Sequence, residues 1–242
     1  MIKNSTDLTE DRVIHTFRGR VSNIYIIEDN QKKVSFLVDC GMPSDAEALT
    51  KVLHYLPPLK RVVCTHFHVD HASGWYILKQ SHKECEIWFH DKAQLAIMGD
   101  ERIPYPSFND IVTIFLPCMR EAGYSPSIGD LFKGGLFGTP FKKGFPSDRV
   151  KFFSSKQAVL PGFKTIHTPG HRPDSVSFFD QNSGILISGD FLLVINGELI
   201  DNTFLSSKEE QEESIDKIRR MNNIKHIFPG HGISLPFSKA NL

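Results

Sequence analysis

The sequence lacks an excess of charge of either sign and lacks a long apolar segment. Its 28 Lys and Arg residues balance 28 Asp and Glu residues, so it has no basic surplus to favour nucleic acid or anionic membranes as partners. No uninterrupted apolar run approaches the roughly 18 residues that a membrane span needs. The N-terminal segment is polar and acidic, which is not typical of a secretory signal. We therefore expect a cytoplasmic protein that binds neither nucleic acid nor membranes.

Cysteine is also scarce. The four cysteines form no CxxC pair and are too few to build a disulfide scaffold in 242 residues, which is compatible with a reducing cytosol. No Pro-, Ser- or Gly-rich linker divides the chain, so we expect one domain over residues 1–242. Within it, residues 100–150 or so contain a Gly-, Phe- and Lys-rich stretch. We interpret this stretch as a loop-rich insert near the active site.

Hydrophobic patterning predicts an α/β protein. Two capping boxes, Ser44 with Glu47 and Ser207 with Glu210, indicate the starts of two helices. Each half of the chain runs from strands through a helix to a strand that ends in histidine, which hints at an internally duplicated architecture. The predicted strands are 23–29, 34–40, 61–67, 86–90, 163–168, 175–180, 184–188 and 226–228, and the predicted helices are 44–56, 74–80, 111–123 and 207–221.

The eleven histidines are unevenly spread, and three of them fall in the segment HFHVDH at the end of a predicted buried strand. Alternation along an extended chain places His66 and His68 on the same side. Asp70 and His71 follow where the chain turns into a helix. Imidazole nitrogen and carboxylate oxygen are ligands that Zn²⁺, Mn²⁺ and Fe²⁺ accept. Four donors this close suit two ions a few Å apart better than one.

Three further donors occur later in the chain, and each follows a predicted strand. They are His171 in TPGH, Asp190 in SGD and His231 in PGHG, and a glycine precedes each of them. Residues beyond the carboxyl ends of strands build the sites of open α/β folds. Glycine there permits a sharp turn and close backbone packing. The sequence therefore predicts that these residues complete the metal centre.

Taken in order, LVDCG, HFHVDH, TPGH, SGD and PGHG resemble the motifs of the metallo-β-lactamase-fold hydrolase superfamily, over about residues 20–235. The resemblance implies an αββα sandwich, in which two mixed sheets lie between outer helices. It also implies two Zn²⁺ ions, with Mn²⁺ or Fe²⁺ as alternatives. The implied ligands are His66, His68 and His171 for the first ion and Asp70, His71 and His231 for the second, with Asp190 as a bridge. Asp39 would orient a ligand histidine, and Thr65 and His167 would lie around the ligands.

This donor set predicts hydrolysis by a hydroxide shared between the two ions, with Asp70 accepting the proton or passing it to the leaving group. An aspartate at position 190 resembles glyoxalase II-like and lactonase-like members rather than true zinc β-lactamases. The eleven residues after His231 leave no room for the helical domain of a conventional glyoxalase II. We expect a hydrolase of a small-molecule ester, lactone or thioester, and a homodimer is compatible with this expectation.

Two other functions stay open at this point. One is a persulfide dioxygenase that binds a single iron at the three-histidine site, and the other is a non-catalytic effector-binding protein with the same fold. Similar lactonases have a tyrosine shortly after the bridging aspartate, where this chain has Phe191. We hypothesise that Phe191, Phe137 and Phe141 wall an apolar acyl pocket. Packing in the core or at a dimer contact is an equal alternative for these aromatic residues.

Overall fold

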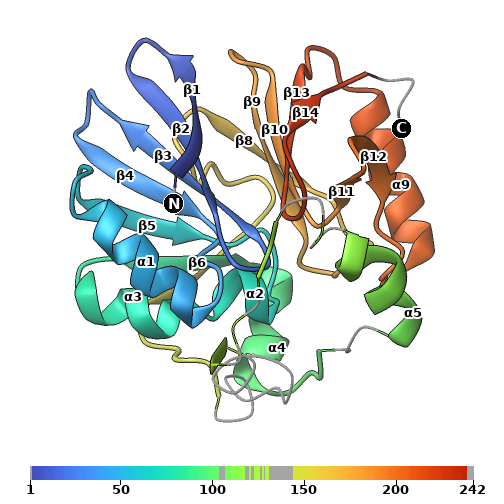
Figure 1. The fold of residues 1–242 in the computed structure, drawn as a ribbon, viewed down its shortest axis with the longest axis horizontal. Coiled ribbons are helices and arrows are strands. Elements are labelled where there is room, and N and C mark those ends of the chain that lie inside the picture. Colours follow the sequence, from blue (N-terminus) through green and yellow to red (C-terminus); the bar gives the residue numbers. More distant parts are fainter. Residues whose placement is uncertain are drawn as a thin grey trace.

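Two β-sheets pack against each other in the computed structural model, and helices lie on the outer side of each sheet (Figure 1). The structure describes residues 2–103, 107–117, 120, 123–125, 127, 129, 130 and 144–238. One sheet has seven strands in sequential order, and the other has five in the order β14-β13-β10-β9-β8. Both sheets mix parallel and antiparallel pairs. This arrangement confirms the predicted αββα sandwich.

The seven-stranded sheet changes from antiparallel to parallel pairing at β4. Strands β1 to β4 form a meander, and β4 to β7 run parallel. Parallel neighbours need a crossover connection, which is why helices appear only from β4 onward. The strands are β1 (Ile2–Thr9), β2 (Arg12–Arg18), β3 (Asn23–Asp29), β4 (Val34–Val38), β5 (Leu59–Val63), β6 (Glu86–His90) and β7 (Val150–Phe153). The helical elements are α1 (Pro43–Leu53), α2 (Val69–Ala72), α3 (Trp75–Ser81), the 3₁₀ turn η1 (Asp91–Ala93), α4 (Gln94–Met98), α5 (Phe108–Asp110) and the π-helical turn η2 (Ile111–Phe115).

The five-stranded sheet comes from the last third of the chain. Its only parallel pair in the described residues joins β10 to β13, and the helix α9 lies between these two strands in sequence. A separate hairpin, β11 with β12, precedes α9. The strands are β8 (Phe163–His167), β9 (Val176–Asp180), β10 (Ile185–Gly189), β11 (Leu192–Ile195), β12 (Glu198–Asp201), β13 (His226–Pro229) and β14 (Leu235–Pro236), and α9 spans Lys208–Arg219.

Three apolar clusters hold the four layers together. Between the sheets, Phe178 packs in one cluster with Tyr25 and Phe228. On the outer face of the first sheet, α1 and α3 bury residues such as Leu49 against it. On the outer face of the second sheet, α9 buries residues such as Ile218. The central strands are therefore buried on both faces, which explains their nearly continuous apolar sequences.

Local sequence signals located most helices but missed one cap. At α1, the backbone N–H of Met42 donates to the carboxylate of Asp45 (3.0 Å), so the predicted Ser44–Glu47 box was wrong. Ser44 instead donates to Asp130 through its backbone N–H (3.1 Å) and its hydroxyl. At α9, the hydroxyl of Ser207 accepts from the backbone N–H of Glu210 (3.2 Å), which confirms Ser207 as the predicted start of this helix.

Several boundaries also differ from the sequence-based expectation. Strand β5 ends at Val63, so the histidine segment lies in a loop and not within a strand over 61–67. Strands β1 and β2 and the β11–β12 hairpin were not predicted; β1 is largely polar and exposed and shows no apolar alternation. In the region expected to form a helix over 111–123, the described turn at Ile111–Phe115 is π-helical. None of the described helices is long and apolar enough to cross a membrane.

The packing between the sheets should dominate stability. Phe178 is fully buried between them, so Phe178→Ala should lower the free energy of unfolding by about 3–5 kcal/mol through lost burial and a residual cavity. Urea unfolding of metal-loaded protein measures this. Tyr55→Ala is the control, because Tyr55 is 85% exposed and its loss should change stability by less than about 0.5 kcal/mol. Equal effects of the two substitutions would contradict this account of the core.

Candidate metal centre

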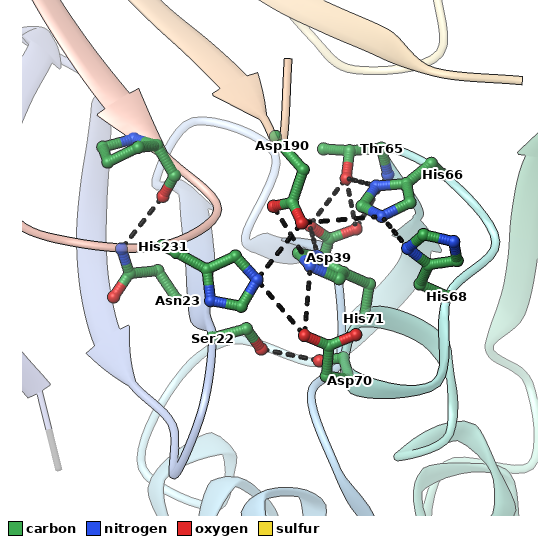
Figure 2. Close-up of polar contacts among 12 residues, drawn as sticks. Ser22, Asn23, Asp39, Thr65, His66, His68, Asp70, His71, Asp190 and His231 are labelled. Atoms are coloured by element: carbon green, nitrogen blue, oxygen red, sulfur yellow. Dashed lines mark hydrogen bonds and ion pairs between the residues drawn. The ribbon is translucent and has the colours of Figure 1, made fainter. Parts of the chain in front are cut away.

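The candidate ligands come from four loops that follow strands of both sheets. His66 and His68 lie in the loop between β5 and α2, and His68 is the N-cap residue of α2. Asp70 and His71 lie in the first turn of α2. The other three ligands lie just beyond β8, β10 and β13; they are His171, Asp190 and His231. The packing of the two sheets thus brings residues 66 and 231 to one site, as Figure 2 shows for six of the seven.

Glycines before two of the ligands permit this close approach. A Cβ atom at Gly230 would lie 2.1 Å from Asp190 Oδ1, and one at Gly189 would lie 2.7 Å from the Cβ of Thr65. Gly189 also has a positive φ of 56°, which favours glycine. The turns that carry Asp190 and His231 therefore pack too tightly against the site for any side chain at these positions.

One cluster consists of His66, His68, His171 and Asp190, and all four are buried. The Nδ1 atom of His68 lies 3.1 Å from Nε2 of His66 and 3.1 Å from Nε2 of His171. Asp190 Oδ2 lies 3.9 Å and 3.7 Å from the same two Nε2 atoms. Three ring nitrogens and a carboxylate oxygen thus converge on one point.

A second cluster consists of Asp70, His71 and His231, and it also meets Asp190. Asp70 Oδ2 lies 3.6 Å from Nε2 of His71 and 3.2 Å from Nε2 of His231. Asp190 contributes Oδ1 at 3.3 Å from His71 and Oδ2 at 3.2 Å from His231. Asp190 is therefore placed between the clusters, in the position predicted for a bridging ligand.

Hydrogen bonds behind the rings fix which nitrogen faces the site. The Nδ1–H of His71 donates to Asp39 (2.9 Å), that of His171 to the carbonyl of Phe204 (2.6 Å) and that of His231 to the carbonyl of Val21 (2.6 Å). Each of these rings consequently presents an unprotonated Nε2 when neutral, as metal ligation requires.

Asp39 and Thr65 extend this outer network. Asp39 accepts from the backbone N–H of Thr65 (2.7 Å) and from its hydroxyl (2.9 Å to Oδ2). The Thr65 hydroxyl in turn accepts from Nδ1–H of His66 (3.0 Å). Asp39 has a positive φ of 63°, a strained backbone conformation for a residue other than glycine. One buried carboxylate therefore orients a histidine in each cluster.

The donor set fits divalent cations. Asp190 Oδ1 and His71 Nε2 are buried and have no hydrogen bond in the described structure. Burial lowers the pKa of His66 and His68, and repulsion from neighbouring imidazoles adds to this effect. Neutral rings with inward lone pairs beside two carboxylates are what Zn²⁺, Mn²⁺ or Fe²⁺ would bind.

The second cluster carries the negative charge that a cation would balance. Burial opposes the charge of His231, but Asp190 and Asp70 outweigh it and raise the pKa of His231 to about 10. Burial also disfavours an ionised Asp190, yet His231 and His71 hold its pKa well below its usual range. Without a cation, protons on the two histidines balance the carboxylates, so metal binding must release protons.

A cavity opens beside both clusters, and part of its wall was not predicted. Asn202 holds the wall in place: its side-chain amide donates to the carbonyl of Asp190 (2.9 Å), and its side-chain oxygen accepts from the N–H of Phe204 (2.9 Å). The Phe204 ring stacks on His68, with centroids 5.8 Å apart. No sequence motif surrounds these residues. The described lining is Val21, His68, Asp70, Ile114, His171, Asp190, Leu193, Asn202, Phe204 and His231.

Phe191 and His167 do not line this cavity. Phe191 is 0% exposed and packs in the apolar cluster beneath α9, so the prediction that it walls an acyl pocket was wrong. Its near neighbour Leu193 lines the cavity instead. His167 donates to the carbonyl of Pro173 (2.8 Å) and stacks on His90. Phe137 and Phe141 lie outside the described residues.

Comparison with known proteins agrees with this geometry. A family model described as the metallo-beta-lactamase superfamily matches residues 17–231. The chain therefore belongs to the metallo-beta-lactamase superfamily of metal-dependent hydrolases.

Curated relatives are similar over most of their lengths. The probable metallo-hydrolase YflN of Bacillus subtilis (strain 168) is 22% identical, over 92% of this chain and 84% of the relative. The probable metallo-hydrolase MJ0888 of Methanocaldococcus jannaschii is 24% identical, over 88% of this chain and 89% of the relative.

Solved structures share the fold. The metallo-beta-lactamase family protein TTHA1429 of Thermus thermophilus superposes with a TM-score of 0.64 at 14% identity, covering 97% of this chain and 78% of that one. TTHA1623 in a di-iron-bound form superposes with a TM-score of 0.57 at 20% identity, covering 91% of this chain and 92% of that one. At these identities the likeness concerns the fold alone.

Asp190 faces both clusters, so its loss should affect both. Asp190→Ala should weaken metal binding by at least about 100-fold, since removing even an outer partner of a ligand costs 10–100-fold. Metal analysis after dialysis against a weak chelator measures this. His226→Ala is the matched control, because His226 lies exposed at the start of β13 and should leave metal content unchanged. Full metal retention by the Asp190→Ala variant would contradict a contribution of Asp190 to both clusters.

The His90–His167 stack predicts a pH-dependent loss of stability. The rings lie 4.4 Å apart, and burial together with the His167 ring lowers the pKa of His90 to about 4. An unfolded histidine has a pKa near 6.5, so the contribution of His90 is present above about pH 6.5 and is lost as pH falls toward 4. His90→Asn should therefore lose less stability than wild type between pH 7 and pH 4.5.

Urea unfolding at each pH measures the difference between the two proteins. At pH 7.5, where His90 is neutral in both states, the difference gives the cost of the substitution itself. Groups at the metal centre titrate alike in both proteins and cancel. If the free energy of unfolding falls equally with pH in wild type and His90→Asn, protonation of His90 does not cause the loss of stability.

Proposed function

We propose that this chain is a dinuclear zinc hydrolase that cleaves an ester, lactone or thioester bond of a small molecule. The observation that carries the proposal is the convergence of seven donors, from four loops, into two clusters that meet at Asp190. His66, His68 and His171 would hold one ion, and Asp70, His71 and His231 would hold the other. When bound, the two ions would supply Lewis acidity and a water molecule acidic enough to ionise near neutral pH.

Asp70 is the residue best placed to handle the proton. Burial disfavours its charge, but His71 and His231 outweigh this effect and hold the pKa of Asp70 below its usual range. It therefore stays ionised at neutral pH. Its side chain is 15% exposed and lines the cavity, so water and a substrate can reach it. We assign Asp70 as the group that accepts the proton of the attacking water or passes it to the leaving group.

Apolar side chains support a substrate with an apolar group next to the reacting bond. Val21, Ile114, Leu193 and Phe204 contribute to the cavity wall. Contact with them would remove apolar surface from water and help to orient the carbonyl toward the clusters. These residues replace Phe191 in the acyl-pocket hypothesis.

The completeness of the second cluster favours two ions over one. A mono-iron dioxygenase needs the three-histidine cluster alone, whereas Asp70, His71 and His231 are also assembled with their outer hydrogen bonds. A non-catalytic binding protein would have no use for all seven ligands. Iron stays an alternative to zinc, because the fold neighbour TTHA1623 has been crystallised in a di-iron-bound form.

Proposals on location and partners rest on simpler observations. Three cysteines, Cys40, Cys64 and Cys85, are buried free thiols, which supports the reducing cytoplasm. The balanced charge supports a small-molecule substrate over nucleic acid or a membrane surface. A homodimer is compatible with both.

The decisive experiment is metal analysis of protein purified without a metal-affinity tag, followed by assays with lactones, thioesters and esters. We expect about two Zn²⁺ per chain and turnover of at least one class. Asp70→Asn should reduce kcat by about 10²–10⁴-fold, the usual contribution of a positioned acid or base. About one iron per chain and oxygen uptake with a persulfide would instead indicate the dioxygenase. Bound metal with no turnover of any class would contradict the hydrolase proposal.

A further inference from the structure

A buried ion pair follows the ligand His171 in the turn between β8 and β9. Arg172 and Asp174 are each 1% exposed, and Arg172 Nε lies 3.2 Å from Asp174 Oδ1. The turn is also tied by backbone contacts: the N–H of Ser175 donates to the carbonyl of Arg172 (3.2 Å), and the N–H of Val176 donates to the carbonyl of Thr65 (2.8 Å). The pair therefore lies where the His171 turn meets the loop of the other histidines.

The second oxygen of Asp174 reaches that loop directly. Asp174 Oδ2 accepts from the backbone N–H of Phe67 (2.7 Å), the residue between His66 and His68. The Phe67 ring is packed against Phe89 and Phe145, with centroids 5.5 Å and 5.2 Å away. Apolar packing thus holds the side chain of Phe67, and a hydrogen bond holds its N–H. Together they fix the backbone from which His66 and His68 project.

Arg172 makes the burial of this carboxylate tolerable. An isolated ionised carboxylate would be costly to bury, and a guanidinium partner offsets much of that cost. Arg172 is itself incompletely paired: Nη1 lies 3.4 Å from Glu101, whereas Nη2 is buried and has no hydrogen bond in the described structure. Replacement of a buried ion pair by apolar residues is often neutral or stabilising, so a gain in stability does not by itself account for this pair.

We propose that Asp174, held by Arg172, is a positioning residue for the cluster of His66, His68 and His171. Its carboxylate joins the two loops that carry these histidines, one oxygen to each. The cluster at Asp70, His71 and His231 does not depend on this bridge, because its rings are oriented by Asp39 and by the carbonyl of Val21. The inference rests on the proposed two-metal centre but on no particular substrate.

The test is a zinc titration of the full chain after removal of metal with a chelator. Wild type should show two binding events. Asp174→Ala should weaken one event by about 10–100-fold, the usual cost of losing an outer partner of a ligand, and change the other by less than about threefold. Asp174→Glu, which keeps the charge, should recover part of the loss. Asp174→Asn keeps an acceptor for the Phe67 N–H but loses the charge, and should weaken the same event by about 3–10-fold.

The same substitution in a His68→Ala variant identifies which cluster loses zinc affinity. In His68→Ala the three-histidine cluster is already impaired, so the remaining zinc-binding event is that of the second cluster. Adding Asp174→Ala to this variant should leave that event unchanged, because Asp174 is proposed to act only through the three-histidine cluster. Glu101→Gln is the matched control; it removes the charge of Glu101, the partly exposed partner of Arg172, and should leave both zinc-binding events as in wild type.

Every other outcome contradicts either the positioning role of Asp174 or the proposed two-metal centre. Equal weakening of both events would assign Asp174 a general structural role. Circular dichroism of the metal-free variants shows whether they fold. If Asp174→Ala does not fold, wild-type affinities in Asp174→Asn overturn the positioning role. If wild type itself binds no zinc, the proposed metal centre is wrong. If wild type and the Asp174 variants all bind two zinc ions with normal affinity, the metal centre stands and only the positioning role of Asp174 is wrong.

Discussion

Five buried imidazoles, the buried carboxylate of Asp190 and the partly exposed carboxylate of Asp70 turn their electron pairs toward one another, and the rest of the structure accommodates this constraint. Such a group of acceptors repels itself unless protons or cations lie between its members. The backs of the rings are therefore bound to fixed acceptors. Asp39, the carbonyl of Val21 and the carbonyl of Phe204 each accept an Nδ1–H, so rotation of a ring would cost a hydrogen bond.

The sandwich supplies the stiffness that this arrangement needs. Each ligand loop follows a strand buried on both faces, so the strand end cannot shift without disturbing a close-packed core. The loops are also tied to one another across the two sheets. Asn23 donates to the carbonyls of Pro229 and Gly232, on either side of His231, and Asp174 accepts from the N–H of Phe67. Outer residues of this kind tie the loops together, although none of them belongs to the two donor clusters.

Much of the fold could be predicted because its signals are local. Runs of apolar, β-branched and aromatic residues marked strands such as β3 and β6, and Ser207 marked the start of α9. Strand β1 was missed because it is a polar edge strand, held by backbone pairing to β2 rather than by its own side chains. The cap of α1 was misassigned because Ser44 finds its partner in Asp130, which is 86 residues away in the sequence. No local pattern contains that information.

The sequence by itself identified the seven donors that the structure brings together, since their residue types fit metal chemistry and the glycines beside them fit close packing. It also pointed to Asp39 and Thr65, whose side chains the structure places in hydrogen bonds with His71 and His66. Only the tertiary structure decided what surrounds the centre. Phe191 and Leu193 lie two residues apart in one short segment, and the packing of α9 decides that the first is core and the second is cavity wall. Phe204 and Asp174 contact the loop of His66 and His68 from more than 100 residues away in the sequence, and such contacts exist only after the two sheets have come together.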